Sequence, residues 1–155
     1  MISETEIRDS QTTGYSVCEY DDAGNMIREI WYSPEGTENN WFSYEYDNLG
    51  EVIRKYLYAG DECLYWNEYT YDEYGNLISD YSYHSDELQG WTTFRYDNEN
   101  MLIEESRYNT DGALTRKYIY EYNECGDVSM ETAYDSDGSL VSGNVYEYDY
   151  DVAGH

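Results

Sequence analysis

Pairs of neighbouring carboxylates are the residues of this chain whose types and spacing come closest to acid–base chemistry. General acid–base and glycosidase mechanisms need two carboxyl groups that face the same bond. Adjacent residues of a β-strand, however, point to opposite faces of the sheet. The pairs therefore do not indicate a reaction centre. They are Asp61 with Glu62, Asp72 with Glu73, Asp86 with Glu87 and Glu104 with Glu105.

The other reactive side chains are few and lie far apart in the sequence. There are two histidines, His84 and His155, and three cysteines, Cys18, Cys63 and Cys125, with no C-x-x-C pair. The phosphate-binding, dinucleotide-binding, zinc-protease and nucleophile-elbow motifs are all missing from the sequence. We therefore expect no enzyme and no cofactor.

Two acidic stretches invite comparison with calcium loops. They are NTDG (109–112) and DSDG (135–138). An EF-hand loop needs further carboxylates at fixed positions and a distant Glu, and neither stretch supplies them. Asp, Asn, Ser and Gly in such order are typical of tight turns. We therefore interpret both as turns and expect no metal site.

The balance of charges is strongly acidic. The chain has 34 Asp and Glu against 8 Lys and Arg, a formal net charge of -26. Such a field attracts basic partners and repels nucleic acid and anionic membranes. No apolar run is long enough to span a membrane. Residues 1–30 show no secretion signal, so we expect a cytoplasmic protein, or a secreted one if a signal has been removed.

One phrase, aromatic-x-Tyr-Asp-x-x-Gly, returns six times along the chain. Its key tyrosines follow one another at intervals of 26, 25, 25, 26 and 28 residues. Because Asp-x-x-Gly is turn chemistry, each copy predicts a strand, a tight turn and a second strand. The copies are CEYDDAG (18–24), YEYDNLG (44–50), YTYDEYG (69–75), FRYDNEN (94–100), YEYNECG (120–126) and YDYDVAG (148–154).

These copies resemble YD repeats, the tyrosine-aspartate repeats of the rearrangement-hot-spot and teneurin type proteins. The resemblance covers about residues 15–154, nearly the whole chain. It implies β-hairpins that build scaffolds or shells, while toxic or adhesive activities lie elsewhere in proteins of that family.

We therefore predict an all-β fold, an antiparallel meander of about eleven strands built from hairpins of about 25 residues. The sheet is either open and twisted or rolled into a barrel or sandwich. Residues 1–13 are expected to form an N-terminal cap or extension, and residues 14–155 a single YD-repeat β domain. Open edges favour a homodimer, formed through the sheet edges or a tryptophan row.

Alternation along the strands assigns the side chains to two faces. The core face is predicted to hold the motif tyrosines, such as Tyr44 and Tyr46, together with the later tyrosines from Tyr32 to Tyr134. The outer face is predicted to hold two rows that bind a partner. The acidic row is Glu29, Glu45, Asp80, Glu105, Glu121 and Glu131, and the aromatic row is Trp31, Trp41, Trp66 and Trp91.

Two interpretations of the tryptophan row stay open at this point. In one, the row packs against another part of the same sheet or under the N-terminal segment. In the other, it is a strip of exposed aromatic rings that binds a partner, since contiguous exposed apolar patches usually mark interaction sites.

The sequence thus favours a non-enzymatic binding protein whose acidic sheet engages a basic, nucleic-acid-binding protein. A meander of this size is about 50 Å wide, and its net charge over that width approaches the charge density of duplex DNA. This favours an inhibitor that mimics nucleic acid, in the manner of phage-borne anti-restriction and anti-CRISPR proteins. The alternative is an extracellular adhesion or carbohydrate-binding module whose Tyr and Trp rows stack on sugar rings.

Overall fold

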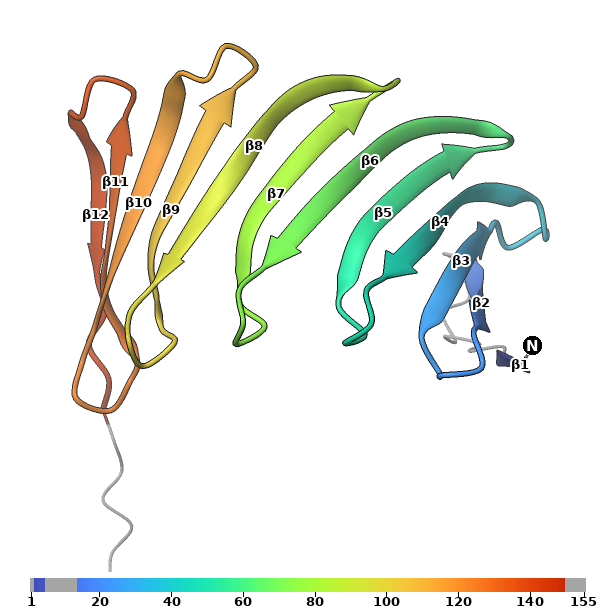
Figure 1. Cartoon of the computed structure of the whole chain (residues 1–155), viewed down its shortest axis with the longest axis horizontal. Coiled ribbons are helices and arrows are strands. Elements are labelled where there is room, and N and C mark those ends of the chain that lie inside the picture. The colour runs from blue at the N-terminus through green and yellow to red at the C-terminus, as the bar shows by residue number, and fades with distance from the viewer. Residues whose placement is uncertain (1, 5–13, 150–155) are drawn as a thin grey trace, which may run out of the picture. The chain divides into compact units, whose positions relative to one another are not determined.

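The computed structural model describes residues 2–4 and 14–149, and within them the chain is an all-β protein of antiparallel strands without a helix (Figure 1). Eleven strands belong to the repeats, as predicted, and β1 is a twelfth. The rest of the predicted N-terminal cap, residues 5–13, lies outside the described residues. The strands are β1 (Ile2–Glu4), β2 (Tyr15–Tyr20), β3 (Met26–Tyr32), β4 (Glu38–Tyr46), β5 (Val52–Ala59), β6 (Glu62–Tyr71), β7 (Leu77–His84), β8 (Glu87–Tyr96), β9 (Leu102–Asn109), β10 (Leu114–Tyr122), β11 (Val128–Asp135) and β12 (Leu140–Val145).

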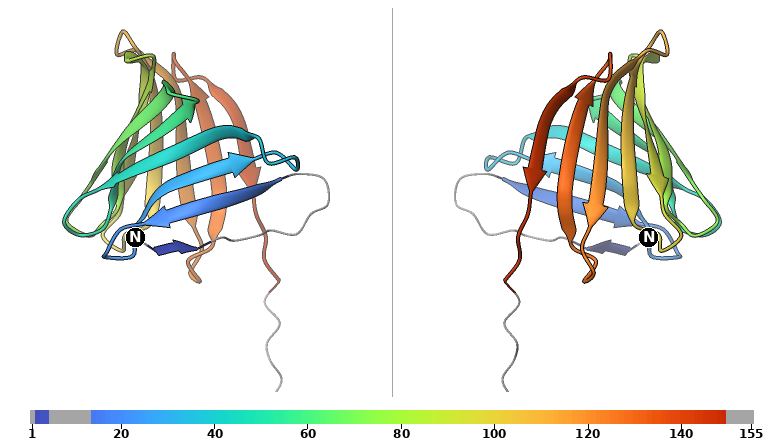
Figure 2. Two further views of the ribbon diagram at one scale, coloured as in Figure 1. Left: turned by 90° about the vertical axis from the view of Figure 1, so that its right-hand side faces the viewer. Right: turned by 90° about the vertical axis from the view of Figure 1, so that its left-hand side faces the viewer.

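The chain divides into two compact units, Met1–Gly90 and Trp91–His155, and strand β8 runs across the boundary. In unit 1, β1 to β7 pair consecutively, and in unit 2, β9 to β12 do the same (Figure 2). Neither run of described strands pairs its last strand with its first, so each is an open sheet and not a barrel. The single domain over residues 14–155 stays a prediction.

The Asp of the motif closes each tight turn. In the third copy, Oδ1 of Asp72 accepts hydrogen bonds from the backbone N–H groups of Tyr74 and Asn76, both at 2.9 Å. An amide oxygen accepts such bonds as well as a carboxylate does, which explains why the fifth copy can use Asn in place of Asp. The residues that make the same pair of bonds are Asp21, Asp47, Asp97 and Asn123.

In the second, third and fifth copies, the hydroxyl of the motif tyrosine forms a hydrogen bond with the preceding hairpin. The Tyr46 hydroxyl donates a hydrogen bond to the carbonyl oxygen of Met26 at 2.6 Å, and the Tyr71 hydroxyl donates to that of Val52 at 2.8 Å. In unit 2, Tyr122 donates to the carbonyl of Leu102 at 2.7 Å. The phenol therefore satisfies a backbone acceptor at the start of a neighbouring return strand, which gives the repeated Tyr-Asp pair a structural role.

The sixth copy starts two residues earlier than its motif suggested. Here the hydroxyl of Tyr148 donates to the carbonyl oxygen of Val128 at 3.0 Å, the bond that the key tyrosine makes in the second, third and fifth copies. Tyr150, the key tyrosine predicted from the sequence, lies outside the described residues. Tyr148 follows Tyr122 by 26 residues, which restores the regular interval.

A β-bulge after each tight turn reverses the predicted faces of the return strands. In the second hairpin, Tyr46 lies opposite Val52 while Glu45 lies opposite Arg54, so Ile53 is an extra residue. Side chains beyond a bulge point to the face opposite to the one that simple alternation predicts. The prediction that the later tyrosines share the face of the motif tyrosines is therefore wrong. The extra residues of the other described hairpins are Ile27, Ile78 and Ser129.

Each unit thus has two faces, which we name after their aromatic residues. The tyrosine face carries Cys18, Phe42, Tyr44, Asn67 and Tyr69 in unit 1 and Tyr118, Tyr120 and Ala133 in unit 2. The tryptophan face carries Trp41, Tyr58, Trp66 and Tyr83 in unit 1 and Trp91, Tyr108, Lys117 and Tyr134 in unit 2.

The hydrophobic core is thin. Among the described residues, the only buried apolar side chains are Cys18, Ile30 and Ala133, and no large side chain is fully buried. Most aromatic side chains of both faces are half-buried. Cross-strand contacts and backbone pairing, and not a deep core, therefore carry the fold.

Candidate binding surfaces

The predicted acidic row does not lie on one face. Because of the bulges, four of its six members lie on the tyrosine face, between the aromatic rings. Asp80 is opposite Tyr69, and its Oδ1 accepts a hydrogen bond from Asn67 Nδ2 at 2.8 Å. The four are Glu29, Asp80, Glu105 and Glu131, each half-buried.

The other two members of the acidic row, Glu45 and Glu121, lie exposed on the tryptophan face. Glu45 forms an ion pair with Arg54 at 3.4 Å and accepts a hydrogen bond from the Tyr56 hydroxyl at 3.3 Å. The sequence prediction of a single outer row is therefore corrected, while its role in binding a partner stays a prediction.

Carboxylates of the tyrosine face change the acidity of the tyrosines beside them. Burial, together with nearby negative charges, raises the pKa of Tyr44, Tyr69 and Tyr120 to about 12. The charges are Glu29 beside Tyr44, Asp80 beside Tyr69, and Glu105 with Glu131 beside Tyr120.

We expect the stability of the fold to fall as the pH rises from 10 to about 12. A phenol whose pKa is higher in the folded state binds its proton more tightly there, so its stabilisation is present below pH 10 and is lost as the pH approaches 12. Thermal unfolding followed by circular dichroism checks this. Tyr69→Phe should remove a part of the alkaline loss that is smaller than about a third, because the pKa values of other tyrosines, among them Tyr46 and Tyr71, are also raised.

The exposed Tyr74, with 71% of its surface accessible, offers the matched control for that experiment. Tyr74→Phe should keep the alkaline loss of the wild type. Equal alkaline losses in the wild type and Tyr69→Phe would contradict the assignment of the effect to the tyrosine face.

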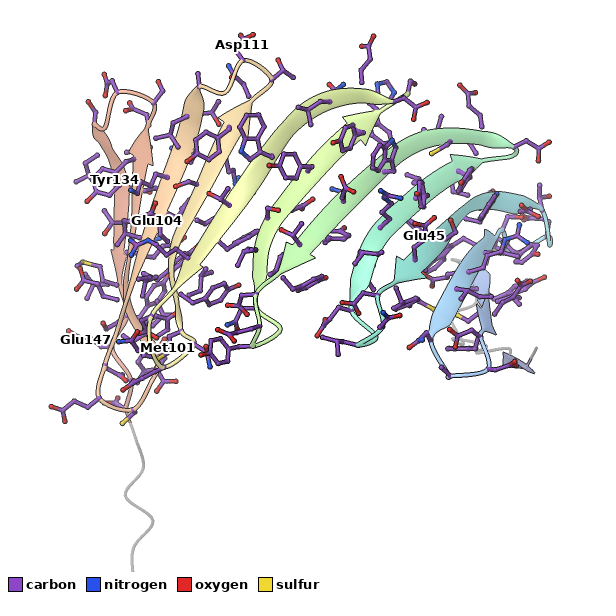
Figure 3. All side chains as sticks on the ribbon, viewed as in Figure 1. Glu45, Met101, Glu104, Asp111, Tyr134 and Glu147 are labelled. Atoms are coloured by element: carbon purple, nitrogen blue, oxygen red, sulfur yellow. The ribbon has the colours of Figure 1, made fainter. Side chains whose placement is uncertain are left out.

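Three of the four tryptophans occupy equivalent places on the tryptophan face, and each stacks on a tyrosine of the next strand. Figure 3 shows the side chains of both faces. Trp31 differs, because it lies opposite Ser16 on the tyrosine face and is 39% exposed. The stacked pairs, with the distances between ring centroids, are Trp41 with Tyr58 at 3.9 Å, Trp66 with Tyr83 at 3.8 Å and Trp91 with Tyr108 at 5.3 Å.

In unit 1, two of these indoles already have contacts on both sides. The Arg28 guanidinium lies 4.2 Å from the ring of Trp41, which also stacks on Tyr58. Trp66 stacks on Tyr83 and has Tyr56 as a second ring neighbour at 5.9 Å. A ligand that stacked on either indole would have to displace one of these groups. This geometry favours internal packing for Trp41 and Trp66.

Several carboxylates in the middle of strands form ion pairs with basic side chains. In unit 2, Glu104, labelled in Figure 3, pairs with Arg95 at 2.8 Å and with Lys117 at 3.0 Å. Burial opposes ionisation, but hydrogen bonds from Arg95, Lys117 and Ser106 outweigh it and hold the pKa of Glu104 below its ordinary value. The strand centres therefore contain counter-charges for a part of their carboxylates.

The uncompensated negative charge lies at the hairpin turns. Every Lys and Arg of the described residues belongs to a strand, so none lies in a turn. We call the row of Asp-x-x-Gly turns the motif-turn rim and the row of turns at the other strand ends the far rim (Figure 1). In unit 1, the motif-turn rim holds Asp21, Asp22, Asp47, Glu51, Asp72 and Glu73. The far rim holds Glu35, Asp61 and Asp86, which are joined by Glu62 and Glu87, the first residues of β6 and β8.

The motif-turn rim keeps its charge at neutral pH. Hydrogen bonds from Asn25 lower the pKa of Asp21, and hydrogen bonds from Asn76 lower that of Asp72. Asp22 and Glu73, the next residues of these turns, are exposed. The rim therefore presents regularly spaced carboxylates to solvent.

A shallow pocket of about 180 Å³ lies on the tyrosine face of unit 1. The Lys55 ammonium lies 4.4 Å from the centre of the Phe42 ring, and Asn67 donates to Asp80 and Ser82 at 2.8 and 2.9 Å. Aromatic rings next to amide and hydroxyl groups can hold a small polar ligand. The lining residues are Phe42, Lys55, Leu57, Tyr65, Asn67 and Tyr69.

The reactive residues considered from the sequence are not brought together. His84 stacks on Tyr65 at 4.6 Å, and His155 lies outside the described residues. Within the described residues, Cys18, Cys63 and Cys125 form no disulfide. The described part of the chain contains no cluster of His, Cys, Asp or Glu that could hold a metal ion. It also contains no helix long and apolar enough to span a membrane.

A protein family of unknown function, DUF2963, matches residues 7–58, less than half of the chain. No curated protein matches. Among solved structures, the chain is similar to the Photorhabdus luminescens Tc holotoxin pore, with a TM-score of 0.56 and 17% identity over 84% of this chain. It is also similar to TcdB2-TccC3, with a TM-score of 0.54 and 16% identity over 85% of this chain.

These similarities concern the fold alone, and they support a YD-repeat-like arrangement of β-hairpins. The chain spans 7% of the length of the first of these structures and 9% of the second. It therefore resembles a small part of each.

Proposed function

We propose that this protein is a non-enzymatic binding protein that engages a basic partner through its acidic turn rims. The observation that carries the proposal is the separation of charges within each unit. Arginine and lysine neutralise carboxylates along the strands, while the turns hold carboxylates and no base. A negative surface without internal counter-charges attracts a cationic surface and speeds its association.

The spacing of the rim supports a partner that normally binds nucleic acid. Successive motif turns are two strands apart, about 9.6 Å, so two carboxylates per turn give one charge per about 5 Å. A single DNA strand carries one phosphate per about 3.4 Å. On this basis the protein acts as a nucleic-acid mimic that inhibits its partner.

We also infer that the chain belongs to the YD-repeat proteins. The motif Asp caps its turn in the described copies, and the motif Tyr bonds the preceding hairpin in the second, third and fifth. The Tyr and the Asp that define the YD repeat are thus the residues that join neighbouring hairpins and cap the turns.

Two triple variants of unit 1 with equal change of charge test the rim. The rim variant carries Asp22→Asn, Glu51→Gln and Glu73→Gln, which spare the Asp residues that cap the turns. The face variant carries Glu29→Gln, Glu45→Gln and Asp80→Asn. Calorimetric titration with an octalysine peptide should show affinity lowered by about tenfold in the rim variant and by less than about threefold in the face variant.

Equal losses in the two variants would show that net charge alone drives binding, and no loss in the rim variant would exclude the rim. Mimicry needs a separate measurement: the wild type should displace a short labelled DNA duplex from a non-specific DNA-binding protein, and the rim variant should do so more weakly. Failure of the wild type to displace the duplex would leave a binding protein that is no mimic.

A second candidate function is carbohydrate binding, which the pocket on the tyrosine face favours. Its rings and the amide of Asn67 are the groups that bind sugars by stacking and hydrogen bonding. Binding on a glycan array that is lost in Phe42→Ala and kept in the rim variant would support this function over the first.

A further inference from the structure

The fifth hairpin lacks the indole ring that three other hairpins carry at the same register position. Trp41 and Trp66 lie directly opposite Tyr58 and Tyr83 and stack on them. At the equivalent place of the fifth hairpin, Lys117 lies opposite Tyr134. The tyrosine is kept, and its aromatic partner is missing.

A pocket takes the place of the missing ring. It has a volume of about 310 Å³ on the tryptophan face of unit 2, and we call it the indole slot. Figure 3 labels Tyr134 near the end of β11. The slot is lined by Leu114, Lys117, Ile119, Tyr134, Asp135 and Gly138.

The preceding hairpin of the same unit shows how an indole would sit there. Trp91 stacks on Tyr108 and reaches the turn, where a Cβ added to Gly112 would meet its Cη2 atom at 3.7 Å. Gly138 is the equivalent glycine in the fifth hairpin, and a Cβ added there would meet nothing within 4 Å. The space that Trp91 fills in one hairpin is open in the next.

We propose that the indole slot binds the side chain of a tryptophan carried on a positively charged segment of a partner protein. The apolar walls and the Tyr134 ring suit a flat aromatic group, and a volume near 300 Å³ is at the small end of ligand pockets, which fits one ring system.

The charges around the slot select a cationic segment. Lys117 is engaged by Glu104 at 3.0 Å, so its charge is compensated. Asp135 lines the slot, and Asp137 lies in the same turn. Turn residues also accept the indole N–H elsewhere: Trp41 Nε1 donates to the Gly60 carbonyl at 2.9 Å and Trp66 Nε1 to Asp86 at 3.2 Å.

Binding in the indole slot is a separate property from the proposed function, because the slot binds an aromatic ring and contains no residue of the motif-turn rim. The probe is tryptamine, an indole with an ammonium group, and the readout is the NMR shift of the Tyr134 ring protons. We expect a saturable shift with tryptamine and binding of indole-3-acetate, whose charge is reversed, weaker by about fivefold.

Two variants that each gain a tryptophan and lose one positive charge control the experiment. Lys117→Trp should fill the slot from within and weaken tryptamine binding by about tenfold or more. Arg107→Trp adds the same ring and removes the same charge on the opposite face, so its binding should stay within about twofold of the wild type. Arg107 lies opposite Arg116 on that face and does not line the slot.

A second slot variant, Tyr134→Leu, keeps an apolar wall but removes the ring, and it should lose the tryptamine-induced shift of the Ile119 methyl protons that the wild type shows. The proposal is overturned if tryptamine leaves the wild-type Tyr134 protons unmoved, or if Lys117→Trp binds tryptamine as the wild type does. Because the probe has a single charge, a negative result here leaves the octalysine experiment on the rim unaffected.

Discussion

Replacing Gly126 with alanine is expected to destabilise the protein by about 1–2 kcal/mol, because a residue with a Cβ must adopt a left-handed conformation there. Gly126 closes the tight turn of the fifth copy with a φ of 86°, and its N–H donates to the carbonyl of Asn123. A Cβ added at this glycine would meet nothing within 4 Å, so the cost is backbone strain without a clash.

The chain supplies the control substitution. In the fourth copy, Asn100 occupies the equivalent position with a φ of 62°. Asparagine adopts this conformation at lower cost than other residues, so Gly126→Asn should cost less than Gly126→Ala. Urea unfolding of both variants measures the difference. If alanine were as well tolerated as glycine, or if asparagine cost as much as alanine, the role of the positive φ would be refuted.

The hairpins could be predicted from the sequence because their causes are local and repeated. Asp72 and its equivalents accept hydrogen bonds from the N–H groups of the residues two and four positions later. The turn therefore depends on only a few consecutive residues. A stretch such as YTYDEYG is weak evidence alone, but six copies at regular intervals predict one antiparallel meander. The open form of the sheets could not be predicted, because it depends on contacts between distant strands.

The faces could not be predicted by counting alternate residues. Counting assumes that each residue adds one step to the strand, whereas Ile53 is inserted as a bulge and shifts every later side chain of β5. The consequence is large: Tyr58 lies with Trp41 and not with Tyr44, and Lys55 lies with Tyr44. One signal was available, since each of the first four tight turns is followed by two successive apolar residues.

The stacked aromatic pairs correspond to a constant interval in the sequence, which the alternation of residues along a strand does not reveal. Trp41 and Tyr58 are seventeen residues apart, and the same interval separates Tyr15 from Tyr32, which also stack. When an interval of seventeen residues separates two aromatic residues in several copies, it indicates that the two residues are partners across one hairpin. The fifth hairpin has Lys117 at the start of this interval, and so the indole slot becomes visible only against the other copies.

The acidic rims do not follow from the alternation of residues within strands, on which the predicted acidic row depends. Glu45 and Glu105 appeared as an outer row, yet they pair with Arg54 and Arg107 at 3.4 and 2.7 Å. The available signal was the complete lack of Lys and Arg in the turns, together with at least one carboxylate in each. The net charge gives the total excess of carboxylates. The positions of the few Lys and Arg residues show where carboxylates have no basic neighbour.

Raising the salt concentration from about 50 to about 500 mM is expected to weaken the octalysine complex by about a hundredfold, because the rim acts as a row of charges. At the lower concentration, the screening length exceeds the spacing of about 9.6 Å between successive motif turns, so one lysine feels several turns. At the higher concentration, each lysine feels only the nearest carboxylates.

The rim variant separates this cause from a general effect of salt. With Asp22, Glu51 and Glu73 neutralised, fewer ions are released on binding, so the logarithm of the affinity should fall less steeply with the logarithm of the salt concentration. The face variant should keep the wild-type slope, because its carboxylates lie among aromatic rings or beside Arg54. An affinity that did not change with salt would mean that contacts other than charge hold the peptide. The proposal that the protein binds a basic partner through its charge would then be refuted.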